Sequence, residues 1–106
     1  MGIKDYIEYL TETIKTKIKP NRLILFGSHA YGIPNKDSDI DILIEIDTDI
    51  KKSKRSIEVS KLFLNREYPL DLIVYTPAEV KSKLSNNDPF LQNIFNKGKV
   101  LYERTD

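Results

Sequence analysis

The chain has 106 residues, of which 40% are hydrophobic and 31% charged, proportions ordinary for a soluble globular protein. Its 17 basic and 16 acidic side chains leave a formal net charge of +1, so we do not expect nucleic acid as a partner. The absence of cysteine excludes thiolate metal sites and the single histidine excludes a multi-histidine zinc site, so a bound metal must have oxygen ligands, as Mg²⁺, Mn²⁺ or Ca²⁺ does.

Nothing in the sequence points to a membrane or to export. No apolar stretch approaches the roughly 20 residues that a membrane-spanning helix needs. The N-terminal segment carries Lys4, Asp5 and Glu8 and has no apolar signal-peptide region. We therefore expect a cytoplasmic protein whose residues 1–106 form a single domain around one core.

The first half of the chain predicts one helix and two strands. Apolar residues recur at helical spacing over residues 3–18, and Pro20 follows them, which predicts an amphipathic helix. Residues 22–26 form a short apolar run of strand length. Residues 39–47 alternate strictly between isoleucine and mostly polar side chains, which is the pattern of a β-strand.

The next segments predict a further helix and a third strand. The basic residues 51–55 are expected to be a solvated loop that leads into a helix, with Ile57, Leu62 and Phe63 facing inward. Residues 70–75 form a strand pattern whose leucines and valine share one face.

The last third predicts two helices and a short edge strand. Residues 76–79 have a capping-box pattern with proline at the first helical position. The pair 88–89 begins another helix, Gly98 stops it, and residues 100–102 follow as an edge strand. This alternation predicts an α/β (α+β) fold with a small mixed β-sheet packed with helices, without fixing the order of the strands.

The most informative motif is the pair Gly27-Ser28 followed, after ten residues, by Asp39-Ile40-Asp41. Glycine lets the backbone turn sharply and approach a ligand, while the serine offers a hydroxyl and N–H groups to phosphate. Asp39 and Asp41 lie two positions apart on a predicted strand, so their carboxylates point the same way. Together these residues predict a site for a metal-bound triphosphate.

Such a site suits nucleotidyl transfer, which needs a grip on the triphosphate, divalent metal and an aligned acceptor hydroxyl. Two carboxylates can share two metal ions about 3.5–4 Å apart, one activating the hydroxyl and the other neutralising the pyrophosphate. A third carboxylate normally fixes the catalytic metal. Asp71 is the candidate, because it faces away from Leu72 and Val74 in its predicted strand.

Two familiar ligand loops do not fit the spacing. An EF-hand that begins at Asp37 requires glycine and glutamate where the chain has Ile42 and Thr48. A P-loop requires lysine where the chain has Ile33. The remaining alternative is a solvated strand face, which the Gly-Ser pair at the matching distance disfavours.

These residues resemble the signature of the DNA polymerase β-like nucleotidyltransferase superfamily, and the small size is similar to that of its minimal, MNT-type members. The resemblance covers most of the chain, including the first helix, residues 69–76 with Asp71, and the closing segment 97–103. It implies a nucleotidyltransferase fold like the palm of polymerase β.

The resemblance also implies roles for individual residues. Asp39, Asp41 and Asp71 would be the catalytic, metal-binding triad for Mg²⁺, with two ions or with Mn²⁺ in its place, and Gly27 and Ser28 would hold the phosphates of ATP. Minimal members are often encoded beside a HEPN-domain protein. The implied function is that of an antitoxin, which moves AMP from ATP to a tyrosine hydroxyl of that partner toxin.

One residue departs from the family pattern. Many members have arginine directly after the Gly-Ser pair, where this chain has His29, and histidine is largely neutral at pH 7. We place His29 with the nucleotide-binding residues and expect triphosphate affinity or donor choice to differ.

Two other functions stay open. A non-catalytic protein-binding antitoxin or adaptor would keep the partner without the transfer, although all three carboxylates are present. Transfer to a small molecule or RNA would keep the chemistry, but such enzymes usually carry an extra acceptor-binding domain, for which 106 residues leave little room. A partner protein or a homodimer would then complete the acceptor cleft.

Overall fold

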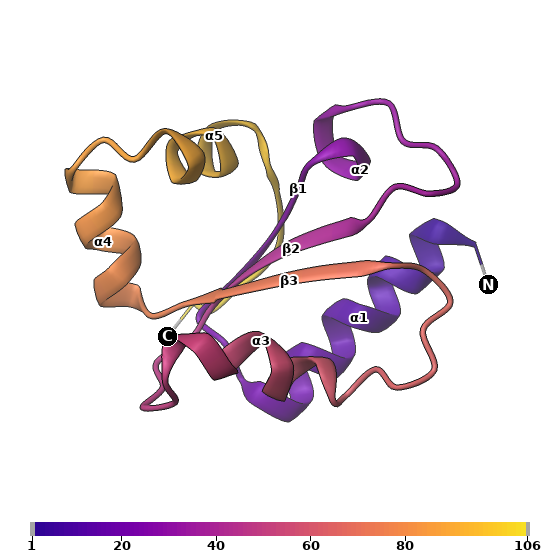
Figure 1. Ribbon diagram of the computed structural model, residues 1–106, viewed down its shortest axis with the longest axis horizontal. Helices are drawn as coiled ribbons and strands as arrows, with labels where there is room; N and C mark the ends of the chain where they lie inside the picture. The colour runs from indigo at the N-terminus through magenta and orange to yellow at the C-terminus, as the bar shows by residue number, and fades with distance from the viewer. Residues whose placement is uncertain (1, 106) are drawn as a thin grey trace.

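The computed structural model describes residues 2–105, in which helices alternate with the strands of one sheet (Figure 1). No helix in this part of the chain is long and apolar enough to cross a membrane. In chain order the elements are α1 (Ile3–Ile18), β1 (Arg22–Phe26), α2 (Ser28–Tyr31), β2 (Ile40–Glu45), α3 (Lys52–Ser60), β3 (Leu70–Tyr75), α4 (Pro77–Ser85), α5 (Pro89–Lys97) and β4 (Lys99–Glu103).

The sheet is mixed, with strand order β3-β2-β1-β4. β1 runs antiparallel to both β2 and β4, whereas β2 and β3 are parallel. A parallel pair needs a crossover connection, and α3 provides it. The predicted α/β (α+β) fold with a small mixed sheet is confirmed, with β2 shorter than the predicted strand at both ends.

Helices cover both faces of the sheet (Figure 1). On one face α1 buries Leu10 and Ile14 in a cluster that includes side chains of α3 and of the strands. On the other face α5 buries Leu91 and Ile94, together with α4. Because both faces are covered, Leu43 of β2 is only 1% exposed although it shares its face with Asp41.

The prediction for residues 51–63 is partly wrong. The helix begins already at Lys52, so the basic segment is helical and Arg55 is buried, with 8% of its surface exposed. Arg55 and Val59 lie four positions apart and face the sheet, which turns Ile57 outward to 59% exposure. Phe63 is buried as predicted, but it lies beyond the end of the helix.

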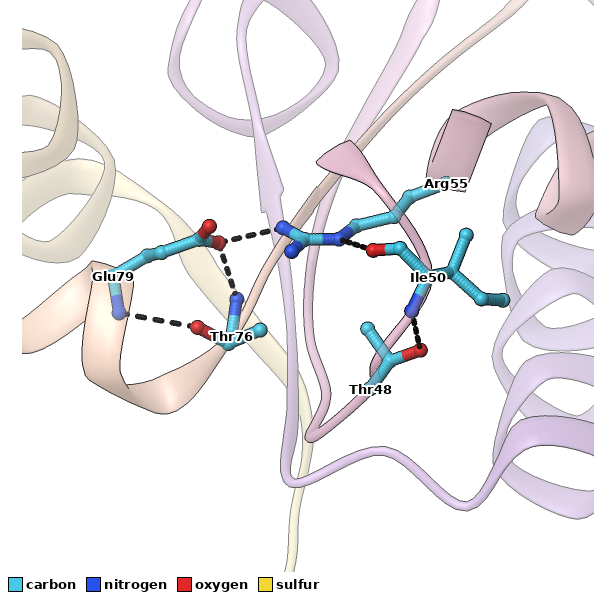
Figure 2. Close-up of polar contacts among 5 residues, drawn as sticks. All are labelled: Thr48, Ile50, Arg55, Thr76 and Glu79. Carbon is cyan, nitrogen blue, oxygen red and sulfur yellow. Dashed lines mark hydrogen bonds and ion pairs between the residues drawn. The ribbon is translucent and has the colours of Figure 1, made fainter. Parts of the chain in front are cut away.

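Arg55 is held by a network that joins the loop after β2 to the start of α4 (Figure 2). Its Nε donates to the carbonyl oxygen of Ile50 at 2.8 Å, and its Nη1 donates to Oε1 of Glu79 at 2.6 Å. The same carboxylate oxygen accepts the N–H of Thr76, and the Thr76 hydroxyl accepts the N–H of Glu79. This reciprocal pair is the predicted capping box, and the network fastens the end of the sheet where β2 and β3 finish.

We expect Glu79→Gln to lower the free energy of unfolding by about 2 kcal/mol near neutral pH, because a buried guanidinium loses its counter-charge. The hydrogen bond from Arg55 holds the pKa of Glu79 below its ordinary 4.5, so this stabilisation is present above pH 4.5 and is lost as the pH falls further. Urea unfolding across this pH range measures it.

The control is Glu58→Gln, which breaks the exposed Lys61–Glu58 pair and should change stability by no more than about 0.5 kcal/mol. If Glu79→Gln were as stable as the wild type near neutral pH, the Arg55 network would not contribute to stability.

Candidate active site

The parallel pairing of β2 and β3 places two of the predicted carboxylates side by side. Asp41 and Asp71 are each the second residue of their strand, and they are direct partners in the register. Paired residues on neighbouring strands project from the same face, so both side chains lie on the face that α5 covers further along. Asp39 lies two positions before Asp41, just outside the strand.

These carboxylates lie at the end of the sheet where β2 and β3 begin. Asp39 and Asp71 are exposed and Asp41 is half-buried. Three hollows in the surface, of about 170, 340 and 590 Å³, are lined by other residues. The carboxylates of Asp39 and Asp71 are therefore open to solvent and lie outside these three hollows.

Gly27 is the residue that brings the Gly-Ser turn against Asp41. It follows β1, whose last residue, Phe26, is the antiparallel partner of Asp41. Its φ of 75° is rarely adopted by residues with a side chain. A Cβ added at Gly27 would overlap Oδ2 of Asp41 and lie 3.0 Å from its Cγ, so only glycine leaves room for this carboxylate.

The short helix α2 connects this turn to the segment before Asp39. The N–H groups of Ala30 and Tyr31 donate to the carbonyl oxygen of Gly27 at 3.0 and 3.1 Å. The Nε2 of His29 lies 3.4 Å from the carbonyl oxygen of Ser38. Since a carbonyl oxygen only accepts, Nε2 carries the proton of this contact, which makes His29 a link between the two halves of the motif.

The negative charges of Asp39, Asp41 and Asp71 act on one another. The pKa of Asp41 is raised from 3.8 to about 6, first by burial and then by the charges of Asp71 and Asp39. His29 acts in the opposite direction. The site therefore concentrates negative charge that its own residues do not neutralise.

A divalent cation would supply the missing positive charge. Among residues 2–105, no three acidic or histidine side chains already converge as a complete metal site. Asp41 and Asp71 are nevertheless adjacent, and Asp39 is close enough to shift the pKa of Asp41. Carboxylate oxygens are the ligands that Mg²⁺ and Mn²⁺ prefer, so these residues fit such an ion.

Two contacts from α5 reach the same region, and the sequence pattern did not indicate either of them. The ring of Phe90 packs on Phe26, with centroids 5.7 Å apart and planes at 90°. Nδ2 of Asn93 donates to the hydroxyl of Tyr31 at 3.0 Å. Asn93 and Tyr31 are 62 positions apart, so helical or strand periodicity carries no signal of their contact.

Comparison with known families agrees with this geometry. The family described as Polymerase beta, Nucleotidyltransferase matches residues 8–106. The chain belongs to the polymerase beta nucleotidyltransferase family. This confirms the predicted superfamily and makes the protein a nucleotidyltransferase.

Two relatives of this nucleotidyltransferase come from Methanocaldococcus jannaschii. MJ0604, named as a candidate protein adenylyltransferase, is 35% identical over 102 residues, which are 95% of each chain. MJ1379, which carries the same description, is 40% identical over 45 residues, covering 42% of this chain and 45% of that protein.

Solved structures share the fold of the nucleotidyltransferase. A crystal structure of the toxin-antitoxin MntA-HepT superposes with a TM-score of 0.62 at 20% identity, covering 95% of this chain and 73% of that one. A mutant of the pair gives 0.60 at 23% identity, covering 99% and 76%. The expected nucleotidyltransferase fold is therefore confirmed.

We expect Gly27→Ala to displace the Asp41 carboxylate. It should also lower the free energy of unfolding by about 1–3 kcal/mol, because φ at this position strains any residue with a Cβ. In an Asp41→Ala background the overlapping atoms are gone and only the backbone strain remains, so the same substitution should cost less. Urea unfolding of the four proteins measures both costs. Equal costs in the two backgrounds would contradict the contact between Gly27 and Asp41.

Asp41 should destabilise the metal-free nucleotidyltransferase at neutral pH. Its pKa is higher in the folded chain than in the unfolded one, so stability falls as the pH rises from 3.8 through 6. In buffer with a metal chelator we expect Asp41→Asn to be more stable near pH 8 by about 1 kcal/mol, after allowance for solvent screening. The gain should vanish below pH 3.8. If Asp41→Asn were less stable than the wild type near pH 8, the charge of Asp41 would not destabilise the folded chain.

Proposed function

We propose that this nucleotidyltransferase transfers AMP from ATP to a tyrosine hydroxyl of a HEPN-domain toxin and thereby acts as its antitoxin. The observation that carries the proposal is the contact between the Gly27 turn and the Asp41 carboxylate, with Asp71 beside it. A turn suited to phosphate and a pair of carboxylates suited to metal meet at one point, as transfer from a triphosphate requires.

Each part of the site has a role in this proposal. Gly27 and Ser28 hold the phosphates, and His29 keeps the turn in place against Ser38. Asp39, Asp41 and Asp71 hold Mg²⁺. When bound, Mg²⁺ lowers the pKa of the attacking hydroxyl and offsets the charge of the departing pyrophosphate.

The transfer itself exchanges one bond for another. The tyrosine oxygen forms a bond to the α-phosphorus of ATP, the bond from that phosphorus to pyrophosphate breaks, and the hydroxyl proton passes to solvent. Asp39 and Asp71 are exposed, so the site is open to a side chain presented by another folded protein.

The relatives support this acceptor class. MJ0604 is similar over nearly its whole length and is named for adenylyl transfer to protein, and the structures with the same fold belong to a toxin-antitoxin pair. We also propose that the chain forms one domain and that the protein is cytoplasmic.

The test uses ATP labelled on the α-phosphate, Mg²⁺, and the HEPN-domain protein of the same host. We expect a labelled toxin band on a denaturing gel with the wild type, and at least a 100-fold lower rate with Asp41→Asn, because that variant loses a metal ligand. ATP labelled on the γ-phosphate should leave no label, which separates AMP transfer from phosphorylation.

Asp49→Asn is the matched control, because it removes an exposed acid beyond the opposite end of β2 and should transfer at the wild-type rate. Full transfer by Asp41→Asn would contradict the proposed site. Absence of labelling together with absence of Mg²⁺-dependent ATP binding would favour the non-catalytic antitoxin.

A further inference from the structure

Two aromatic side chains near the candidate active site are partly exposed to solvent. Phe90, in the first turn of α5, is 45% exposed, and Tyr31, at the end of α2, is 43% exposed. Leaving a phenylalanine half in water forgoes much of the stabilisation that its burial would give. The position of Phe90 suggests what covers it.

Only the side chain of Phe26 separates Phe90 from Asp41. Its ring rests on Phe26, and Phe26 is the register partner of Asp41, directly across from it. Paired residues of antiparallel strands project from the same face, so Phe26 connects the Phe90 ring to the Asp41 side chain without an intervening layer.

The same side of α5 faces α2. Asn93 follows Phe90 by three positions, so the two side chains share one side of the helix. Asn93 donates to the hydroxyl of Tyr31 at 3.0 Å, so this side of α5 is turned toward the end of α2. Phe90 thus packs on the register partner of Asp41 and lies on the side of α5 that faces α2.

We propose that the exposed ring of Phe90 is the stacking surface for the nucleobase of the donor nucleotide. The inference rests on the proposed function, which places the triphosphate at Gly27, Ser28 and the carboxylates. An aromatic heterocycle stacks on a phenylalanine ring whatever its hydrogen-bonding edge, and one such contact typically changes affinity by about fivefold to a hundredfold. Of the two exposed rings we choose Phe90, because it packs on Phe26, the register partner of Asp41.

The first test compares ATP with inorganic triphosphate, both with Mg²⁺, by calorimetric titration. Phe90→Ala should weaken ATP binding on the order of tenfold and leave triphosphate binding unchanged, because only ATP carries a base. Phe90→Leu, which keeps an apolar contact with Phe26, should lose ATP affinity to a similar extent. Thermal unfolding of each variant confirms that it is folded at the temperature of the titration.

Tyr9→Ala is the matched control, because Tyr9 is also 43% exposed and lies on α1, against the opposite face of the sheet. It removes an equally exposed ring and should leave both affinities unchanged.

A second test uses the absence of tryptophan from the sequence. In Phe90→Trp the single indole should be quenched by ATP and not by triphosphate. Tyr9→Trp should respond to neither. This spectroscopic signal is independent of any transfer activity.

The outcomes separate the base site from the phosphate and metal site. ATP affinity in Phe90→Ala within twofold of the wild type, or an equal loss for ATP and triphosphate, would overturn the role of Phe90 alone. A wild type that binds neither compound would overturn the proposed function, and the stacking surface with it.

Discussion

The parallel register of β2 and β3 is the constraint on which the site depends. It aligns Asp41 with Asp71 and so holds two negative charges next to each other. Backbone hydrogen bonds at both ends of the pair fix this register. The N–H of Ile40 donates to the carbonyl oxygen of Pro69, and the N–H of Ile46 donates to the carbonyl oxygen of Tyr75, each at 2.9 Å. A slip by one residue would send one of the two carboxylates to the opposite face.

The two ends of this strand pair differ in how well their charges are balanced. Where the strands finish, Arg55 and Glu79 neutralise each other, and Glu79 also forms a capping box with Thr76. Where they begin, Asp41 is left with a raised pKa and acidic neighbours. Unfavourable charge that is retained at one end of a well-satisfied fold is typical of a binding or catalytic site, because a ligand is expected to relieve it.

The sequence predicted the elements well because their signals are local. Alternating isoleucines mark β2, and the Thr76–Glu79 capping box lies within four consecutive residues. The burial of Arg55 was missed because its partner Glu79 is 24 positions away, and a run of basic residues normally indicates a solvated surface.

In the candidate site, too, sequence indicated what depends on spacing along the chain but not what depends on tertiary packing. The spacing of Gly27 and Asp41 indicated a shared site, and their contact in the fold agrees with it. Placing Asp71 beside Asp41 requires the strand order, which the pattern did not contain. The approach of Phe90 to this region depends on the packing of α5, which only the tertiary structure shows.

If a divalent metal binds at the start of β2 and β3, as we propose, paramagnetic broadening by Mn²⁺ will locate it there. Substoichiometric Mn²⁺, added with ATP to ¹⁵N-labelled protein, should broaden the amide signals of Gly27, Ser28, Asp41 and Asp71 before all others. Asp41→Asn should abolish this selectivity. Broadening that is centred elsewhere, or that persists unchanged in Asp41→Asn, would contradict a metal site at these carboxylates.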